Sequence, residues 1–172
     1  MKTAEILRSE SIYLRNLDSS DVTEQYVQWL HNPEVNRYLD VQKNLPTLNQ
    51  QKNYVQKIAD SSDKLLFGIF TFDNKLIGST KLHFYEAEKV EIGIMIGDLE
   101  SQGKGYGKST VNLLIALAGR LGIKILTAGY DFENLRSANL FKSCGFAVIE
   151  KKDYGLSADC LNRVIRTILK VN

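Results

Sequence analysis

Cysteine, proline and histidine are all scarce in this chain of 172 residues. Two cysteines, Cys144 and Cys160, are too few for a disulfide framework. The histidines, His31 and His83, belong to no ligand cluster with a recognised spacing, so we expect no metal. The longest apolar run, near Leu113 to Ala118, is too short to span a bilayer, and the N-terminus has no apolar stretch of signal-peptide length. These absences predict a cytoplasmic protein without a membrane partner.

An excess of one charge is also missing. Lysine and arginine number 22, aspartate and glutamate 20, and the net charge is +2. This balance argues against a protein that holds nucleic acid mainly through bulk charge. The hydrophobic fraction of 44% and the charged fraction of 24% are typical of a globular protein. Since no repeat, linker or low-complexity segment occurs, we expect residues 1–172 to form a single domain.

Local signals predict four helices. Asp21 and Glu24 have the spacing of a capping box, and Asn32-Pro33 stops the helix that follows. Thr47 and Gln50 repeat that spacing at the start of a second helix. An apolar stripe over 111–121 predicts a third helix. The fourth is expected to begin at the N-cap Asn134 and to end before Gly145, a residue suited to the left-handed C-cap conformation.

Apolar and β-branched runs predict the strands. The residues Asp73-Asn74-Lys75 suit a tight hairpin turn between the second and third of them. The order of elements combines hairpins with strand–helix–strand crossovers. We therefore expect a mixed α+β (α/β) fold, with one mixed, mostly antiparallel sheet of about six to seven strands and helices on both faces. The expected strands are 12–14, 65–72, 76–85, 90–96, 123–130, 146–151 and 163–169.

The most informative stretch is Gln102-Gly103-Lys104-Gly105-Tyr106-Gly107-Lys108-Ser109, which lies between a predicted strand and a predicted helix. Glycine lets consecutive backbone N–H groups turn toward an anion and approach it closely. The start of a helix adds its own free N–H groups and the positive end of its dipole. Together with Lys104 and Lys108, these features predict a pyrophosphate site.

Two familiar phosphate motifs do not match this stretch. A Walker A loop needs glycine where the chain has Gln102, and a dinucleotide fingerprint needs glycine where it has Lys108. The pattern that fits is Gln/Arg-x-x-Gly-x-Gly/Ala. A glycine-rich turn without a ligand is the alternative reading of the loop taken by itself.

At this point the sequence resembles the GNAT superfamily of acetyl-CoA-dependent N-acetyltransferases, in particular its RimJ/RimL-like branch. Besides the loop, Glu91-Ile92-Gly93 resembles the Glu-Ile-Gly of that branch. The segment from Asn134 through Ser137 to Gly145-Phe146 is similar to its Asn-x-x-Ser…Gly-Phe segment, with matching spacing. The opening residues 12–21 and 29–39 also read like that branch, so the resemblance covers nearly the whole chain.

The resemblance implies where acetyl-CoA binds. The strand before the loop splays from its neighbour in this family, which leaves the backbone of Ile94, Met95 and Ile96 free to pair with pantetheine. The N–H groups of the loop would hold the pyrophosphate. The side chain of Asn134 matches a position that commonly contacts the cofactor, and it also suits a plain helix N-cap. The implied loop donors are Gln102, Gly103, Lys104, Gly105, Tyr106, Gly107 and Lys108.

The implied reaction is direct attack of a neutral amine on the thioester, through a tetrahedral intermediate. A base must first remove a proton from the amine, and a backbone N–H of the 90–96 strand would meet the oxyanion. Glu91 is the preferred base, since it lies on an otherwise apolar strand and burial would raise its pKa. The alternative for Glu91 is a carboxylate on the opposite face, solvated or paired with lysine. His83 is a second candidate base, although a lone strand histidine is more often packed or exposed.

The chain departs from the family at Phe141, where many relatives carry a tyrosine whose hydroxyl can protonate the leaving thiolate. Tyr85, Tyr106 and Tyr130 are possible substitutes, each also explicable as structural. Cys144, beside a helix-ending glycine, reads as a core residue rather than a nucleophile.

We thus expect an N-acetyltransferase acting on a primary amine, either a protein N-terminus or a small molecule such as an amino sugar. A non-catalytic acetyl-CoA sensor is the alternative, and a P-loop phosphotransferase is weakened by Gln102. The acceptor is expected beside 29–38 and 154–162. The expected partners are this amine acceptor and no nucleic acid, and the protein is expected to be a monomer or a homodimer.

Overall fold

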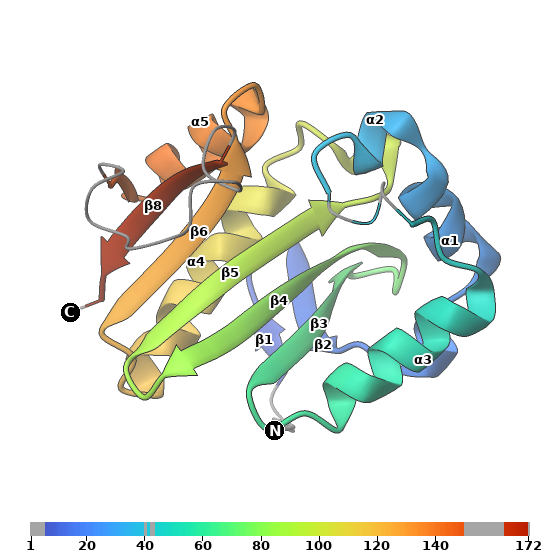
Figure 1. Ribbon diagram of the computed structural model, residues 1–172, viewed down its shortest axis with the longest axis horizontal. Coiled ribbons are helices and arrows are strands. Elements are labelled where there is room, and N and C mark those ends of the chain that lie inside the picture. Colours follow the sequence, from blue (N-terminus) through green and yellow to red (C-terminus); the bar gives the residue numbers. More distant parts are fainter. Residues whose placement is uncertain (1–5, 40, 42–43, 150–163, 172) are drawn as a thin grey trace.

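The computed structural model describes residues 6–39, 41, 44–149 and 164–171. These residues form one sheet with helices on both faces, as the sequence predicted (Figure 1). The strand order is β1-β2-β3-β4-β5-β6-β8-β7. All neighbouring strands are antiparallel except β5 and β6, which are parallel. The strands are β1 (Leu7–Arg8), β2 (Ile12–Asn16), β3 (Lys64–Thr71), β4 (Leu76–Glu86), β5 (Lys89–Ile96), β6 (Ile125–Asp131), β7 (Ala147–Val148) and β8 (Val164–Lys170).

In the described part of the chain, the helices exceed the four expected by one, the short α2. Pro33, predicted to stop the first helix, follows its end and opens α2 at the position where proline is favoured. Strand β1 is a second addition, because two residues carry no readable periodicity. The helices are α1 (Glu24–His31), α2 (Pro33–Asn36), α3 (Leu48–Ala59), α4 (Tyr106–Arg120) and α5 (Leu135–Ser143), with 3-10 turns η1 (Ser19–Asp21) and η3 (Leu99–Ser101).

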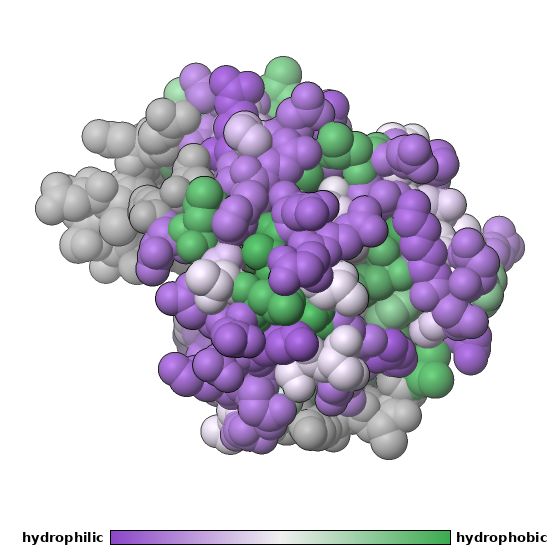
Figure 2. All heavy atoms as spheres, turned by 90° about the vertical axis from the view of Figure 1, so that its right-hand side faces the viewer, coloured by the Kyte–Doolittle hydropathy of each residue, from purple (hydrophilic) through white to green (hydrophobic). Residues whose placement is uncertain are grey.

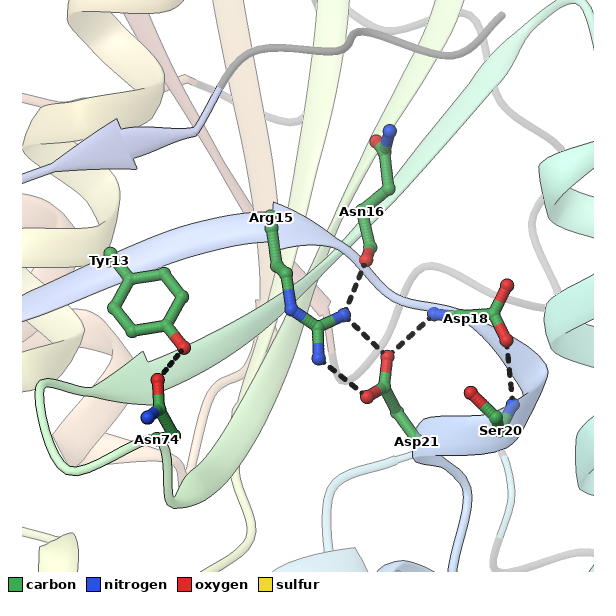
Figure 3. Close-up of polar contacts among 7 residues, drawn as sticks. All are labelled: Tyr13, Arg15, Asn16, Asp18, Ser20, Asp21 and Asn74. Carbon is green, nitrogen blue, oxygen red and sulfur yellow. Dashed lines mark hydrogen bonds and ion pairs between the residues drawn. The ribbon is translucent and has the colours of Figure 1, made fainter.

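The prediction that Asp21 and Glu24 form a capping box was wrong. Asp21 instead closes a capping box with Asp18 at η1, accepting from the Asp18 backbone N–H at 2.8 Å (Figure 3). Helix α1 starts one turn later, where the Thr23 hydroxyl accepts from the backbone N–H of Tyr26. The chain thus has two N-caps in succession: Asp18 caps the 3-10 turn η1, and Thr23 caps α1.

An ion pair fixes the route from β2 to α1. The guanidinium of Arg15 donates two hydrogen bonds to the Asp21 carboxylate, at 2.7 and 2.6 Å (Figure 3). The Asp21 hydrogen bond and charge raise the pKa of Arg15 against the opposing effect of burial. Arg15 also lies over the ring of Phe70, 4.1 Å from its centroid. Because two planar contacts fix the guanidinium, the pair holds the η1 turn against β2 and β3.

Other local predictions are confirmed. Thr47 and Gln50 form a capping box at α3. Asn134 caps α5, and Gly145 follows it with φ +88°. Asn74 in the β3–β4 hairpin has φ +64°, a conformation that asparagine tolerates better than most residues. Each of these features depends on neighbours within a few residues, which is why the sequence alone predicts them.

Two apolar clusters cover the two faces of the sheet. On one face, α4 and α5 pack through residues such as Leu114 and Phe141 onto strand residues such as Phe67. On the other face, α1 and α3 pack through residues such as Tyr26 and Val55 onto Leu66 and Met95. Leu65, Phe67 and Ile69 of β3 thus belong to the first cluster and Leu66 to the second, as the alternation of a strand requires.

The parallel pair separates part of the way along its length. Strands β5 and β6 are paired from Lys89 with Ile125 as far as Ile92 with Ala128. Beyond this point β5 continues to Ile96 beside β4 alone. The two strands therefore diverge in the middle of the sheet. Within the described ranges, no helix combines the length and apolarity needed to cross a membrane.

Candidate functional site

A cleft of about 1630 Å³ lies on the α1–α3 face of the sheet, where those helices leave it uncovered. Its floor comes from β4, β5, β6 and β8, and its walls from α1, the segment after α2, α3 and the start of α5. Figure 2 looks onto the side of the molecule that carries α1–α3, where hydrophilic residues surround small hydrophobic patches. Apolar side chains such as Leu30 and Leu66 line the cleft together with many polar and charged ones, so it can hold a small molecule that itself carries polar groups.

Glu91 projects from β5 into this cleft, so the alternative placement on the opposite face is wrong. Its side chain is 23% exposed. One carboxylate oxygen accepts from Arg166 on β8, and the other accepts from the hydroxyl of Tyr85 on β4. The lysine partner considered from the sequence is thus an arginine instead. Glu91 lies within a network of three strands and has one ionic partner among the described residues.

Gly129 on β6 makes the contact between Glu91 and Arg166 possible. Arg166 and Gly129 face each other across β6 and β8. A Cβ atom at Gly129 would lie 2.6 Å from the Nη1 atom of Arg166. Because glycine has no side chain, the guanidinium crosses over β6 and reaches the carboxylate on β5.

His83 lies directly opposite Glu91 on β4 and also lines the cleft. Its Nε2 is 3.2 Å from an Asp63 carboxylate oxygen. The Ser61 hydroxyl and the Lys64 ammonium hold the pKa of Asp63 well below its ordinary value. Asp63 is therefore a carboxylate near neutral pH and accepts the Nε2 proton of His83.

A buried hydroxyl pair forms the part of the floor next to α1. The Tyr26 hydroxyl and the Ser79 hydroxyl lie 2.9 Å apart. Burial raises the pKa of Tyr26 to about 12, against the opposing effect of the Ser79 hydrogen bond. Tyr26 therefore remains protonated at neutral pH, and either hydroxyl of the pair can donate to the other.

The glycine loop has the conformation that an anion site needs. Gly103 and Gly105 have φ of +76° and +84°, and Gly105 is the N-cap of α4. A Cβ atom at either position would meet nothing within 4 Å. Among the described residues, no backbone carbonyl accepts from the N–H groups of residues 103–108. The loop therefore presents consecutive free donors at a helix N-terminus.

Gln102 differs from the remainder of the predicted donor set. Its backbone N–H donates to the carbonyl of Leu99 at 3.1 Å, so this group is not free for a phosphate. Its side-chain amide donates to the Ile96 carbonyl at 3.0 Å and accepts from Arg136 on α5. Gln102 thus joins the end of β5 to the start of α5.

Asp98 anchors the same loop from the other side. Its carboxylate accepts from the Ser101 hydroxyl and pairs with Lys75 of the β3–β4 hairpin at 3.0 Å. Burial opposes ionisation of Asp98, but these two contacts and the charge of Lys104 leave its pKa lowered. The segment between β5 and α4 is therefore tied to the sheet before the glycines begin.

Of the remaining predicted residues, Asn134 both caps a helix and lines the cleft, whereas Phe141 and Cys144 pack in or against the core. The Asn134 side chain accepts from the backbone N–H of Ser137 at 3.1 Å, and Asn134 also lines the cleft. Phe141 is 2% exposed and packs on Tyr130 and Phe146. Cys144 packs against the core on the α4–α5 side, and burial raises the pKa of its thiol, as expected of a core cysteine.

The structure brings Glu91, Ile94, Met95 and Asn134 to one cleft and places the glycine loop beyond the end of β5. From the predicted acceptor segment 29–38, Leu30, Arg37 and Tyr38 line the cleft. The other predicted segment, 154–162, lies outside the described residues, as does Cys160. Sequence analysis missed Arg166 and the side-chain role of Gln102, because the contacts of Arg166 with Glu91 and of Gln102 with Arg136 join residues distant in the chain. Among the described residues, no group of three or more His, Cys, Asp or Glu side chains could hold a metal ion.

Comparison with known sequences places this geometry in context. Residues 11–147 match the family model described as acetyltransferase (GNAT) domain. MJ1062 of Methanocaldococcus jannaschii is 25% identical over 140 residues, which cover 81% of this chain and 29% of that protein. The chain thus spans less than a third of the length of this relative.

Solved structures share the fold at low sequence identity. RimL, a ribosomal L7/L12 alpha-N-protein acetyltransferase in complex with coenzyme A, superposes with a TM-score of 0.81 at 18% identity, covering 97% of this chain and 98% of that one. Spermidine N-acetyltransferase from Vibrio cholerae, in complex with CoA and spermine, gives 0.79 at 18% identity, with coverage of 95% and 97%. At these identities the likeness shows a common fold.

Proposed function

The chain belongs to the GNAT acetyltransferase family, and on that premise we propose that it transfers the acetyl group of acetyl-CoA to a primary amine. The observation that carries the proposal is the divergence of β5 from β6 with free N–H groups at the following helix start. The first feature exposes strand backbone to an extended ligand arm, and the second binds an anion.

We assign the cofactor contacts on this chain as follows. The N–H groups of residues 103–108 hold the pyrophosphate, with Lys104 and Lys108 nearby. The backbone of β5 beyond Ile92 pairs with the pantetheine arm. At Ile96 the carbonyl is already used by Gln102, so we assign the pairing to Ile94 and Met95 and to the Ile96 N–H. Asn134 contributes from the α5 side. Acetyl-CoA supplies the acetyl group as a thioester.

Glu91 is the proposed base, acting directly or through a water molecule. Only the neutral amine has a lone pair for attack, so its proton must pass to an acceptor in the cleft. Arg166 and Tyr85 occupy one position at each carboxylate oxygen and fix the orientation of the carboxylate. Each carboxylate oxygen has a further lone pair for a proton or a water molecule. A backbone N–H of β5 stabilises the oxyanion.

Of the three tyrosines considered from the sequence, Tyr130 is the one best placed to protonate the departing thiolate. Tyr85 is engaged with Glu91, and Tyr106 begins α4, whereas Tyr130 lines the cleft and stacks on Phe141. We therefore propose Tyr130 as the proton donor in place of the tyrosine missing at position 141. We further propose a cytoplasmic protein, monomeric or homodimeric, whose acceptor is a protein N-terminus or a small-molecule amine.

Two measurements on the purified protein test this function. Calorimetry measures acetyl-CoA affinity, and a thiol assay measures CoA release with a panel of amines and N-terminal peptides. We expect binding, and release that depends on one class of acceptor. Binding without turnover on any amine would favour the acetyl-CoA sensor, and absence of binding would overturn the proposal.

A further inference from the structure

Lys81 is a cation on the cleft floor that has no partner among the described residues. It lies on β4 between Ser79 and His83, and alternation of the strand places the three on one face. Ser79 is bound to Tyr26, and His83 is bound to Asp63. Lys81 is half-buried, yet it forms no hydrogen bond or ion pair with the residues that the structure describes.

The surroundings of Lys81 leave room for a ligand. Its cross-strand partner on β5 is Gly93, where a Cβ atom would meet nothing within 4 Å. The carboxylate two residues along β5 is Glu91, which is held by Arg166. The other cleft cation, Arg37, lies 5.6 Å from the centroid of the Tyr38 ring. The acidic lining residues Asp131 and Glu133 come from the end of β6 and the turn after it, and among the described residues neither they nor Glu91 pair with Lys81.

The position of this charge matters because it is close to the divergence of the strands. The pair Lys81–Gly93 comes directly after Ile92, the last β5 residue paired with β6. Under the proposed function, the acceptor amine reaches the acetyl group near this point. A lysine there repels an acceptor with only positive charges and attracts one that carries an anion near its amine.

We propose that the acceptor is an amine that carries an anionic group, a carboxylate or a phosphate, and that Lys81 binds this group. The inference rests on the proposed acetyltransferase function. It excludes a polyamine as the preferred acceptor. Partial desolvation of an unpaired ammonium is unfavourable, and an anionic acceptor removes that cost by supplying the missing partner.

Matched pairs of acceptors test the inference. Glucosamine 6-phosphate against glucosamine probes a phosphate, and serine against serinamide probes a carboxylate. The readout is kcat/KM for CoA release by the wild type, Lys81→Met, Lys81→Arg and the control Lys57→Met. Lys57 lies in the last turn of α3, outside the cleft lining.

We expect the wild type to favour the anionic member of one pair by about tenfold or more. Lys81→Met should abolish that preference while keeping turnover of the neutral member, and Lys81→Arg and Lys57→Met should keep the preference. The pair that shows the preference identifies the anion. Acetyl-CoA affinity should be the same in all four proteins.

Several results would overturn the inference. These are a wild type that prefers the neutral members or neither, a Lys81→Met variant that keeps the preference, and a protein that acetylates neutral amines but no anionic amine. Failure of the proposed function itself would be distinct, because the wild type would then either not bind acetyl-CoA in calorimetry or bind it without releasing CoA on any amine, the neutral members included.

Discussion

At the scale of single residues, the cleft is built from side chains held by partners on other strands. Glu91, His83 and Ser79 each have a partner that fixes them, namely Arg166, Asp63 and Tyr26. Fixed groups hold one orientation without a reorganisation cost when a substrate arrives. Two residue-scale predictions follow from the side chains that face this space.

Glu91→Gln keeps the shape of the side chain and removes the proton acceptor. Turnover at neutral pH should fall by roughly 10²-fold or more, which is the usual contribution of a general base. Calorimetry should give an acetyl-CoA affinity close to that of the wild type. Arg166→Met is the comparison variant, because it removes the ionic partner of Glu91 and leaves the Glu91 carboxylate in place. Wild-type turnover and an unaltered pH profile in Glu91→Gln would exclude Glu91 as the base.

Position 141 should be structural and position 130 catalytic. Phe141→Leu removes ring contacts with Tyr130 and Phe146, so it should cost about 1–2 kcal/mol of stability but keep substantial turnover. Tyr130→Phe keeps the stacking and removes the hydroxyl, so single-turnover CoA release should slow by about 10²-fold. If Phe141→Leu lost its turnover while Tyr130→Phe released CoA at the wild-type rate, Tyr130 would not be the proton donor. A hundredfold acceleration by Phe141→Tyr would favour the sensor.

At the scale of elements, helix α4 has glycines in the left-handed region at both ends. Gly105 precedes it with φ +84°, and Gly122 follows it with φ +72°. A Cβ atom at either site would meet nothing within 4 Å. The two positions therefore share the same backbone strain on substitution, about 1–2 kcal/mol, but differ in their distance from the proposed pyrophosphate.

Because the two glycines are equivalent in backbone conformation, a substitution at Gly122 is a control for the same substitution at Gly105. Gly105→Val and Gly122→Val should lower the stability by similar amounts in urea denaturation. Only Gly105→Val should weaken acetyl-CoA binding, by about tenfold or more, because its side chain would stand between the free N–H groups and the phosphates. Equal affinities in the two folded variants would show that the loop does not bind the pyrophosphate.

The loop before α4 should be sensitive to acid through Asp98. Its pKa is lowered in the folded protein, so its contribution to stability is present above the ordinary aspartate pKa and is lost as the pH falls through the lowered value. Asp98→Asn should cost about 1–3 kcal/mol at pH 7. The difference in unfolding free energy between Asp98→Asn and the wild type should become smaller below about pH 4. Urea denaturation at several pH values measures the unfolding free energy of both proteins.

A difference between wild type and Asp98→Asn that stays constant with pH would contradict this prediction. Lys75→Met provides a second check, because it removes the ammonium and leaves the Ser101 hydrogen bond. Lys75→Met should lower the unfolding free energy at pH 7 by less than Asp98→Asn does. Its difference from the wild type should also become smaller at low pH.

The elements also show what a sequence can predict. The Thr47 cap, the left-handed Gly145 and the hairpin at Asn74 depend on a few adjacent residues, and all were predicted correctly. Two adjacent capping signals at Asp18 and Asp21 gave a wrong helix start, because local spacing does not decide between them. Strand β1 has two residues and depends on pairing with β2.

Residues of the candidate site could be predicted from the sequence only where they belong to a local motif. The glycine loop and Glu91 were found from local patterns, and Glu91 does line the cleft. Its partner Arg166 is 75 residues away, and only the order of strands brings the two together. The glycine that allows this contact, Gly129, gave no signal, because an isolated strand glycine has several structural explanations.

At the scale of the whole molecule, one strand serves both the core and the cleft. The chain leaves β5 at Gly97, where a Cβ atom would lie 2.3 Å from the Trp29 ring on α1. Four residues earlier on the strand, Gly93 faces open space in the cleft. The same substitution at these two glycines should therefore separate stability from activity.

Gly97→Ala forces the buried Trp29 to move and should cost about 1–3 kcal/mol. Gly93→Ala should leave the stability unchanged or raise it by about 0.5–1 kcal/mol, because alanine is preferred to glycine in a strand interior. It should raise the KM for the acceptor amine, since the added methyl group enters the cleft. Thermal denaturation and steady-state kinetics of both variants measure these effects. A destabilised Gly93→Ala with unchanged kinetics would contradict the assignment of this surface.

The divergence of β5 from β6 also has a consequence for how the protein assembles during synthesis. Strands β1 to β5 neighbour one another in chain order, so this half of the sheet can pair while later residues are still being made. The other half joins it through α4 and a ladder that ends at Ile92 and Ala128. A ligand bound across this junction would hold the halves together, adding about 2.7 kcal/mol at a concentration one hundred times its Kd.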